Sequence, residues 1–302
     1  MQEMPPTRCG FVALIGVPNA GKSTLLNALV GAKVSIVSRK VQTTRTQIRG
    51  IAMHGRTQIV FVDTPGIFAP KRRLDRAMVT SAWGGAADAE RIGVLIDVTR
   101  ADEDSQSALM ERLGDIRQPK FLVLNKIDLI PREKLLALTA RFNAAHQFEA
   151  TFMVSALNGS GVSDILDHLA DKLTLGPWLY PEEDISDAPL RFLAAEITRE
   201  KLFERLHDEL PYRSTVETEK WTTMKNGDVR IDQVIFVERE SQRKIVLGEG
   251  GSTIKRIGTA ARKDIMEAVD AKVHLFLFVK VRENWLNDPE RYREMGLEFP
   301  KG

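Results

Sequence analysis

The chain has 302 residues, of which 43% are hydrophobic and 28% charged, and its net charge at pH 7 is +2. This composition is that of an ordinary globular protein, and the length suits two domains. No window approaches the ~18 consecutive apolar residues of a membrane-spanning helix, and the first ten residues do not resemble a secretory signal. The lone cysteine, Cys9, excludes an internal disulfide and fits a reducing cytoplasm.

Short apolar runs alternate with helical stretches over the first 175 residues. Apolar runs without polar alternation indicate strands that are covered on both faces. The strands are predicted at 11–17, 57–64, 92–98, 121–126 and 150–156, and the helices at 23–30, 74–87, 105–113, 133–143 and 162–172. This order predicts an α/β domain with a mostly parallel sheet, whose ligands bind beyond the carboxyl ends of the strands.

The segment GVPNAGKS, residues 16–23, follows the first predicted strand and precedes the first predicted helix. It fits the Gly-x4-Gly-Lys-Ser/Thr pattern of a phosphate-binding P-loop, in the context that this motif needs. Its glycines let backbone N–H groups turn toward phosphate oxygens, and the helix N-terminus adds its dipole. We expect Lys22 to reach the β- and γ-phosphates and Ser23 to bind Mg2+. The residues predicted to bind nucleotide here are Gly16, Val17, Pro18, Asn19, Ala20, Gly21, Lys22, Ser23 and Thr24.

The segment DTPG follows the predicted strand at 57–64. We expect Asp63 to hold Mg2+ indirectly and the Gly66 amide to contact the γ-phosphate, with Thr64 and Pro65 completing this part of the nucleotide site. The polar segment 39–50 lies before that strand and is interpreted as a mobile switch loop. Thr44 is predicted to supply a second hydroxyl to Mg2+, with Thr43 as the alternative.

The segment NKID, residues 125–128, ends another predicted strand. Asp128 can accept two hydrogen bonds from guanine N1–H and its exocyclic amine, a donor pair that adenine lacks. Asn125 is predicted to read the other edge of the base, and the stem of Lys126 to cover it. The segment SAL, with Ser155, Ala156 and Leu157, ends the last strand of this half. Together these segments have the order of a GTPase, and NKID disfavours an ATPase or a small-molecule kinase.

The pattern changes after residue 175. A segment with three prolines and four acidic residues predicts a linker at 176–190, which leaves 1–175 as the first domain. Residues 191–302 are predicted to form an α+β domain in the order strand, helix, strand, strand, helix, helix, strand, helix. Its first strand is placed at RFLAAEIT, and STIKRIGTAARKDIMEAV, residues 252–269, has helical spacing.

The segment VLGEGGSTIKRIG, residues 246–258, resembles the Gly-x-x-Gly loop of a KH domain. Two glycines let a backbone approach a nucleic-acid strand, and the following helix directs its N-terminus at the phosphates. The residues predicted to bind RNA are Gly248, Glu249, Gly250, Gly251, Lys255 and Arg256. They lie in a basic cluster from Arg243 to Lys263. The alternative for the cluster is a solvated helix face, and the alternative for the glycine loop is a glycine-rich helix cap.

A GTPase domain followed by a type II KH domain resembles the Era family of bacterial GTPases. The segments QTTRTQIRGI, RLDRAM and VKVRENWLNDP carry the resemblance further, whereas Thr46 and SAWGGAADAERI depart from the family pattern. The resemblance implies binding of GTP and GDP, and of 16S ribosomal RNA near its 3′ end, in assembly of the small ribosomal subunit. It also implies a cytoplasmic protein with peripheral association at the inner membrane, and we expect a monomer.

Ile67 stands where other GTPases carry a glutamine that orients the attacking water. Some families that resemble this chain instead recruit K+ through a P-loop asparagine, and Asn19 occupies the matching position. The predicted catalytic residues are Asn19, Lys22, Thr44 and Gly66, with Mg2+ and K+ as cofactors. Asn19 has the alternative role of a loop residue bonded to its own backbone.

Two other functions are alternatives to a GTPase that acts on ribosomal RNA. One is an RNA-binding assembly factor that uses GTP mainly as an affinity ligand and hydrolyses it incidentally. The other is a tRNA-modification GTPase, which is disfavoured because that class predicts a C-terminal cysteine and Cys9 is the only one.

Overall fold

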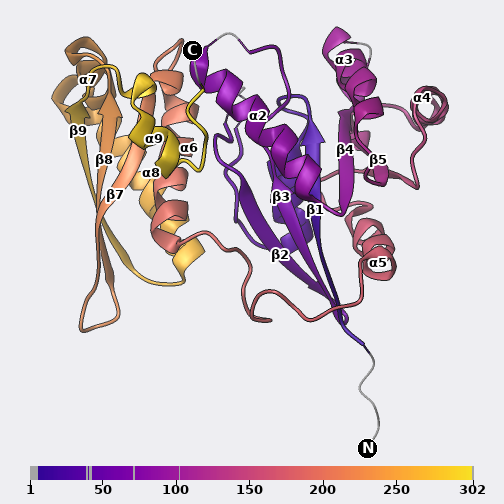
Figure 1. Ribbon diagram of the computed structural model, residues 1–302. Helices are drawn as coiled ribbons and strands as arrows, with labels where there is room; N and C mark the ends of the chain where they lie inside the picture. Colours follow the sequence, from indigo (N-terminus) through magenta and orange to yellow (C-terminus); the bar gives the residue numbers. More distant parts are fainter. Residues whose placement is uncertain (1–5, 39, 41–42, 71, 102, 301–302) are drawn as a thin grey trace, which may run out of the picture. The chain divides into compact units, whose positions relative to one another are not determined.

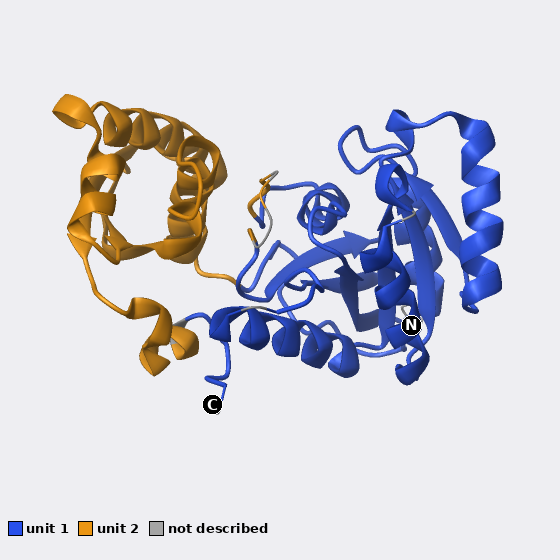
Figure 2. Cartoon of the chain, turned by 90° about the horizontal axis from the view of Figure 1, so that it is seen from above, with its two compact units in different colours: residues 1–35, 44–187, 295–302 blue, residues 36–43, 188–294 orange. Residues whose placement is uncertain are grey.

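The computed structural model describes residues 6–38, 40, 43–70, 72–101 and 103–300. The contacts divide the chain into two compact units (Figure 2). The first unit comprises residues 1–35, 44–187 and 295–302, and the second comprises residues 36–43 and 188–294. The assignment of residues 36–43 to the second unit has no counterpart in the sequence pattern.

The first unit is built on a six-stranded sheet in the order β2-β3-β1-β4-β5-β6 (Figure 1). Strand β1 pairs in parallel with β3 and β4, β4 with β5, and β5 with β6, whereas β2 is antiparallel to β3. The strands are β1 (Arg8–Gly16), β2 (Ile48–His54), β3 (Thr57–Asp63), β4 (Arg91–Asp97), β5 (Lys120–Asn125) and β6 (Thr151–Val154). The mostly parallel α/β fold is therefore confirmed, and β2 is an added edge strand.

All five helices expected in this half are present. They are α1 (Lys22–Val30), α2 (Arg73–Asp88), α3 (Asp104–Arg112), α4 (Arg132–Ala145) and α5 (Val162–Lys172). Every residue of β3 and β5 is buried, as is typical of strands covered on both faces. The loops after β1, β3, β5 and β6 carry the predicted motifs, so the parallel order brings these motifs to one edge of the sheet.

The proline-rich segment that begins at residue 176 lies along the first unit up to residue 187. The Gly176 amide donates to the Thr7 carbonyl at 3.0 Å, and the Ile51 amide donates to the Ile185 carbonyl at 2.9 Å. The Gln58 side chain accepts from the amides of Leu179 and Tyr180 at 2.9 and 3.0 Å. These bonds hold much of the predicted linker against the sheet.

The second unit has a three-stranded sheet in the order β7-β8-β9, with β7 antiparallel and β9 parallel to β8. Its elements are α6 (Leu190–Arg205), β7 (Ser214–Thr223), β8 (Val229–Val237), α7 (Glu240–Leu247), α8 (Ser252–Val269), β9 (Val273–Val281) and α9 (Pro289–Glu294). The predicted α+β class is confirmed. Among the described residues, no helix is both long and apolar enough to span a bilayer.

One predicted element is wrong. The run RFLAAEIT does not form a strand, because it is the first half of helix α6. Its buried side chains Leu193, Ala194 and Ile197 recur at helical spacing and pack into one cluster of the second unit's core. The spacing continues to Leu202, which packs with Ala195 in a second cluster. An apolar run of eight residues cannot distinguish a strand from a buried helix by periodicity alone.

Candidate nucleotide site and RNA-binding loop

The P-loop joins β1 to α1 and takes two left-handed backbone conformations. Asn19 has φ 65° and Gly21 has φ 97°. Asparagine tolerates such a conformation better than most side chains, whereas a Cβ atom on Gly21 would lie 2.2 Å from Nδ2 of Asn125. The backbone conformation thus favours asparagine at position 19, and both the backbone conformation and the close packing require glycine at position 21.

The Lys22 ammonium lies against the P-loop itself. Its Nζ donates to the carbonyls of Gly16 and Val17 at 3.0 and 3.2 Å, and the residue is buried. Burial lowers the pKa of Lys22 to about 8, against the opposing attraction of Asp63. Phosphate oxygens favour the charged form of such a buried amine, so Lys22 is suited to hold a polyphosphate.

Three hydroxyl groups converge on the carboxylate of Asp63, at the end of β3. Ser23 and Ser35 donate to Oδ2 at 2.7 and 2.9 Å, and Thr44 Oγ1 lies 3.5 Å from Oδ2 and 3.0 Å from Ser23 Oγ. Burial raises the pKa of Asp63, while Lys22 and the three hydroxyls oppose that shift. Within the described part of the chain, Oδ1 of this buried carboxylate has no hydrogen-bond partner.

This cluster fits Mg2+, because the ion binds oxygen ligands and Oδ1 of Asp63 remains available. The structure separates the two candidate threonines. Thr44 lies in the cluster, whereas the Thr43 hydroxyl donates to the Lys40 carbonyl at 2.8 Å. This geometry favours Thr44. Three residues of the predicted switch loop, Arg39, Val41 and Gln42, lie outside the described residues.

The DTPG segment packs directly on the P-loop. The Thr64 hydroxyl donates to the Leu14 carbonyl at 2.8 Å, and the Ile67 amide donates to the Gly16 carbonyl at 3.0 Å. A Cβ atom on Gly66 would lie 3.0 Å from backbone atoms of Pro18. Pro65 is buried, and the Ile67 side chain is only 6% exposed. Ile67 is thus a packed apolar residue with no group to orient water.

Asn125 bonds to the backbone of the loops around it. Its Nδ2 donates to the Ala20 carbonyl at 2.8 Å, and its Oδ1 accepts from the amides of Lys126 and Ala156 at 2.8 and 3.0 Å. Asn125 therefore ties the P-loop to the SAL segment, and its Nδ2 has a second hydrogen to donate to a base. The tie was not predicted, because the three segments are far apart in the sequence.

The other residues of the predicted base site divide into an inner and an outer group. Inside, Lys126 Nζ pairs with Asp97 Oδ2 at 2.5 Å, and Ser155 Oγ is buried without a partner among the described residues. Outside, Asp128 is exposed and Leu157 is 84% exposed. The outer side chains are open to a ligand. Asp97 was not predicted, because it does not belong to a recognisable sequence motif.

The predicted RNA-binding loop joins α7 to α8. Gly248, Gly250 and Gly251 have φ 74°, 56° and 77°, and nothing lies within 4 Å of a Cβ atom built on Gly250. Glu249 and Gly250 are exposed. Glycine at position 250 is therefore required by the backbone turn and leaves the tip of the loop bare for close approach by a ligand.

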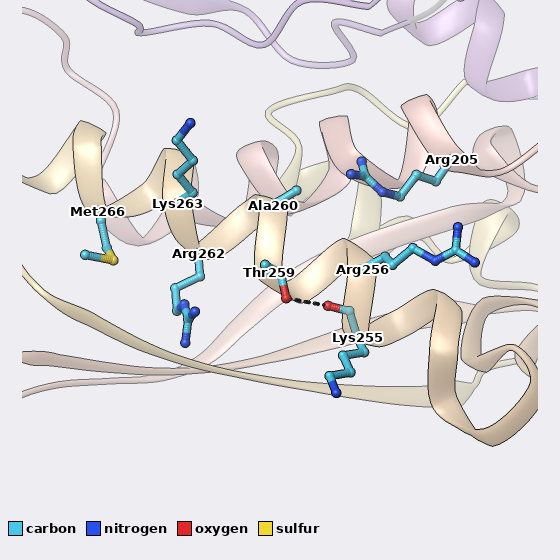
Figure 3. A pocket seen from close by; sticks show the side chains of 8 residues that line it. All are labelled: Arg205, Lys255, Arg256, Thr259, Ala260, Arg262, Lys263 and Met266. Atoms are coloured by element: carbon cyan, nitrogen blue, oxygen red, sulfur yellow. Dashed lines mark hydrogen bonds between the residues drawn. The ribbon is translucent and has the colours of Figure 1, made fainter.

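Basic side chains continue from this loop along α8 (Figure 3). They line a groove of about 630 Å³ formed by Arg205, Lys255, Arg256, Thr259, Ala260, Arg262, Lys263 and Met266. Figure 3 shows Lys255 and Arg262 on one side of α8 and Lys263 on the other. These three side chains are exposed. Arg262 and Lys263 belong to the basic cluster of the sequence but were not among the predicted site residues.

Two family profiles match the chain. One, described as "50S ribosome-binding GTPase", matches residues 11–126, and the other, described as "KH domain", matches residues 209–286. GTPase Era of Rhizobium meliloti is 67% identical over 296 residues, covering 98% of this chain and 95% of its own. GTPase Era of Afipia carboxidovorans is 65% identical over 300 residues, covering 99% and 97%.

Two solved structures extend the likeness to the whole fold. A variant of Aquifex aeolicus Era bound to GDP·AlF4− superimposes with a TM-score of 0.90 at 35% identity, covering 96% of this chain and 99% of that chain. A structure of Era with MgGDPNP and nucleotides 1506–1542 of 16S ribosomal RNA gives the same score, identity and coverage. The GTPase and KH profiles, the relatives and these folds agree, and the chain belongs to the Era family of GTPases.

Proposed function

We propose that this GTPase binds the 3′ region of 16S ribosomal RNA through its KH domain and so assists assembly of the small ribosomal subunit. The observation that carries the proposal is the 0.90 TM-score with Era bound to MgGDPNP and to nucleotides 1506–1542 of that RNA. The left-handed glycine loop and the basic groove of α8 support it.

The nucleotide site supports a division of roles among the predicted residues. Lys22 holds the β- and γ-phosphates, and the Gly66 amide lies beside the P-loop, where it contacts the γ-phosphate. Asp128 and Asn125 bind guanine, and the backbone bonds of Asn125 also tie the P-loop to the SAL segment. Ser23 and Thr44 supply hydroxyls for Mg2+, with Asp63 behind them. When bound, Mg2+ neutralises charge on the phosphate oxygens.

The attacking water needs a partner other than Ile67. We infer that Asn19 would hold a K+ ion beside the phosphates, where the ion would offset charge that builds up between the β- and γ-phosphates, as an arginine finger does. The left-handed conformation of Asn19 is compatible with this role and also with a loop residue bonded to its own backbone.

The RNA site has two parts. The loop from Gly248 to Gly251 contacts the backbone of a single strand, since its glycines expose the N-terminal end of α8. Lys255 and Arg256 follow within the first two turns of that helix and neutralise phosphates. The helix-cap alternative explains the left-handed glycines but gives no reason for the exposed cations along α8.

A second function is favoured by one observation, the packed and inert Ile67 side chain. In that function GTP serves as an affinity ligand for RNA binding and is hydrolysed incidentally. Phosphate release by the full chain, with and without small ribosomal subunits, separates the two. A rise in kcat with subunits supports the switch, and an unchanged rate supports the affinity ligand.

The remaining expectations follow the family. We propose that the GTPase part covers residues 1–175 and the KH part residues 191–302, joined by residues 176–190. The proposed location is the cytoplasm, with peripheral association at the inner membrane, and the proposed state is a monomer. Sedimentation of the full chain tests the last of these.

A further inference from the structure

Residues 36–43 connect two residues of the nucleotide site but are themselves part of the second unit. On one side, Ser35 donates from its hydroxyl to Asp63. On the other side, Thr44 places its hydroxyl beside Ser23. The two flanking residues thus meet at the same carboxylate, while the described residues Ile36, Val37, Lys40 and Thr43 make contacts within the second unit.

Those contacts are with helix α6. Ile36 is fully buried in the core cluster that includes Ile197. The Val37 amide donates to Glu200 Oε1 at 2.7 Å. The Lys40 ammonium donates to the Phe203 and Leu206 carbonyls at the C-terminal end of α6. A cation is favoured there by the orphan carbonyls and the helix dipole.

The last contact comes from Arg199, also on α6. Its Nη2 donates to the Thr43 carbonyl at 2.5 Å, and the side chain is 2% exposed. Glu196 accepts from Nε at 2.7 Å, and the guanidinium carbon lies 5.3 Å from the centre of the Phe203 ring. Glu196 thus holds the Nε–Nη2 edge of the guanidinium and Phe203 lies against its face, whereas Nη1 has no hydrogen-bond partner among the described residues.

The Thr43 carbonyl and the Thr44 amide belong to one planar peptide group. A bond that fixes this carbonyl also fixes the plane from which the Thr44 side chain departs. Only the backbone and χ1 rotations of Thr44 then remain to set its hydroxyl against Ser23 and Asp63. The arginine thereby acts through two consecutive residues on a site that its own side chain does not touch.

We propose that Arg199 is a positioning residue for GTP hydrolysis, which sets the Thr44 hydroxyl through the Thr43 carbonyl. The inference rests on the proposed role of Thr44 in binding Mg2+ with GTP. It makes the hydrolytic site depend on a helix that lies beyond residue 187, outside every nucleotide-binding motif.

The test compares Arg199→Met and Arg199→Lys with wild type in the full chain. Loss of a buried charge-assisted hydrogen bond corresponds to about tenfold or more in an equilibrium constant. With Arg199→Met we expect affinity for a non-hydrolysable GTP analogue to fall about tenfold, GDP affinity to hold within about twofold, and half-maximal hydrolysis to need more Mg2+. Arg199→Lys keeps a cationic donor but lacks the guanidinium fork, so its affinity for the GTP analogue should lie between those of wild type and Arg199→Met.

The matched control is Thr198→Val on the same helix. It removes a buried 2.6 Å hydrogen bond to Gln233 without touching the segment 36–43. We expect it to lower thermal stability and to leave the ratio of GTP-analogue to GDP affinity unchanged. If folded Arg199→Met keeps that ratio and the wild-type Mg2+ requirement, the positioning role is wrong.

A second readout is independent of catalysis. Hydrogen exchange of the amides from Thr44 to Gln47 should be faster in Arg199→Met than in Thr198→Val, and equal rates would contradict the proposal. If the wild-type protein does not hydrolyse GTP, and if in Mg2+ it binds the GTP analogue and GDP equally well, then the proposed function is wrong. The exchange comparison still decides whether Arg199 orders this segment.

Discussion

Gly21→Ala tests the packing of the P-loop against the NKID segment. The new Cβ atom would lie 2.2 Å from Asn125 Nδ2 at a residue with φ 97°. Relief of that clash moves the Asn125 amide and weakens its three bonds to backbone groups, at 2.8, 2.8 and 3.0 Å. At about 1 kcal/mol for each bond and about 1 kcal/mol for the dihedral, the variant should lose about 4 kcal/mol of stability.

The assay is urea unfolding of the nucleotide-free chain, with Gly31→Ala as the matched control. Gly31 has φ 77°, and nothing lies within 4 Å of a Cβ atom built there. That variant should lose only about 1 kcal/mol, the dihedral part of the cost.

In an Asn125→Ala background, Gly21→Ala should also cost only about 1 kcal/mol, because the clashing atom is gone. Equal costs for Gly21→Ala and Gly31→Ala in the wild-type background would refute the role of Asn125 as a tie between loops.

Three further predictions concern the ligand. The pKa of Lys22 is about 8 in the free protein, and bound phosphates should raise it, so GTP binding takes up a proton above pH 8. Calorimetry should therefore show a GTP affinity that falls about tenfold per pH unit above pH 8 and does not change just below pH 8. Asp128→Asn should weaken GTP and favour xanthosine triphosphate by roughly 10⁴ in relative affinity, and unchanged GTP binding in a nucleotide titration would contradict the guanine contact. GTP hydrolysis should be about 10²–10³ times faster in K+ than in Na+. Asn19→Gly, which keeps the left-handed backbone, should remove that difference. Equal phosphate release by wild type in both salts would leave Asn19 as a loop residue.

The P-loop and the DTPG segment could be found from sequence because phosphate binding needs particular residues at fixed local spacing. Lys22 donates to the Gly16 carbonyl of the P-loop, and Ser23 donates to Asp63. The helix at 252–269 was likewise evident, since its apolar residues recur at 3.6-residue spacing with a glycine loop before it.

The rest depends on contacts between distant residues. Ser35 has no motif around it and joins the Asp63 cluster only through folding. The bond from the Ala156 amide to Asn125 could not be predicted either, because 31 residues separate the two. The same limit hid the contact between Thr43 and Arg199, which are separated by 156 residues.

GTP and RNA are proposed to bind at separate sites of this chain, and the decisive measurement is filter binding of an RNA that corresponds to nucleotides 1506–1542 of 16S ribosomal RNA. The variant is Glu249→Asp with Gly250→Asp, and the control is Gly227→Asp, another exposed glycine of the second unit with φ 85°. The double variant adds negative charge and strain where phosphates approach.

For the double variant we expect RNA affinity to fall by at least about tenfold, and wild-type binding to weaken steeply with salt as phosphate contacts release counterions. GTP affinity and RNA-free hydrolysis should stay at wild-type values in both proteins, and the control should bind RNA normally. Wild-type RNA affinity in a folded double variant would contradict the account.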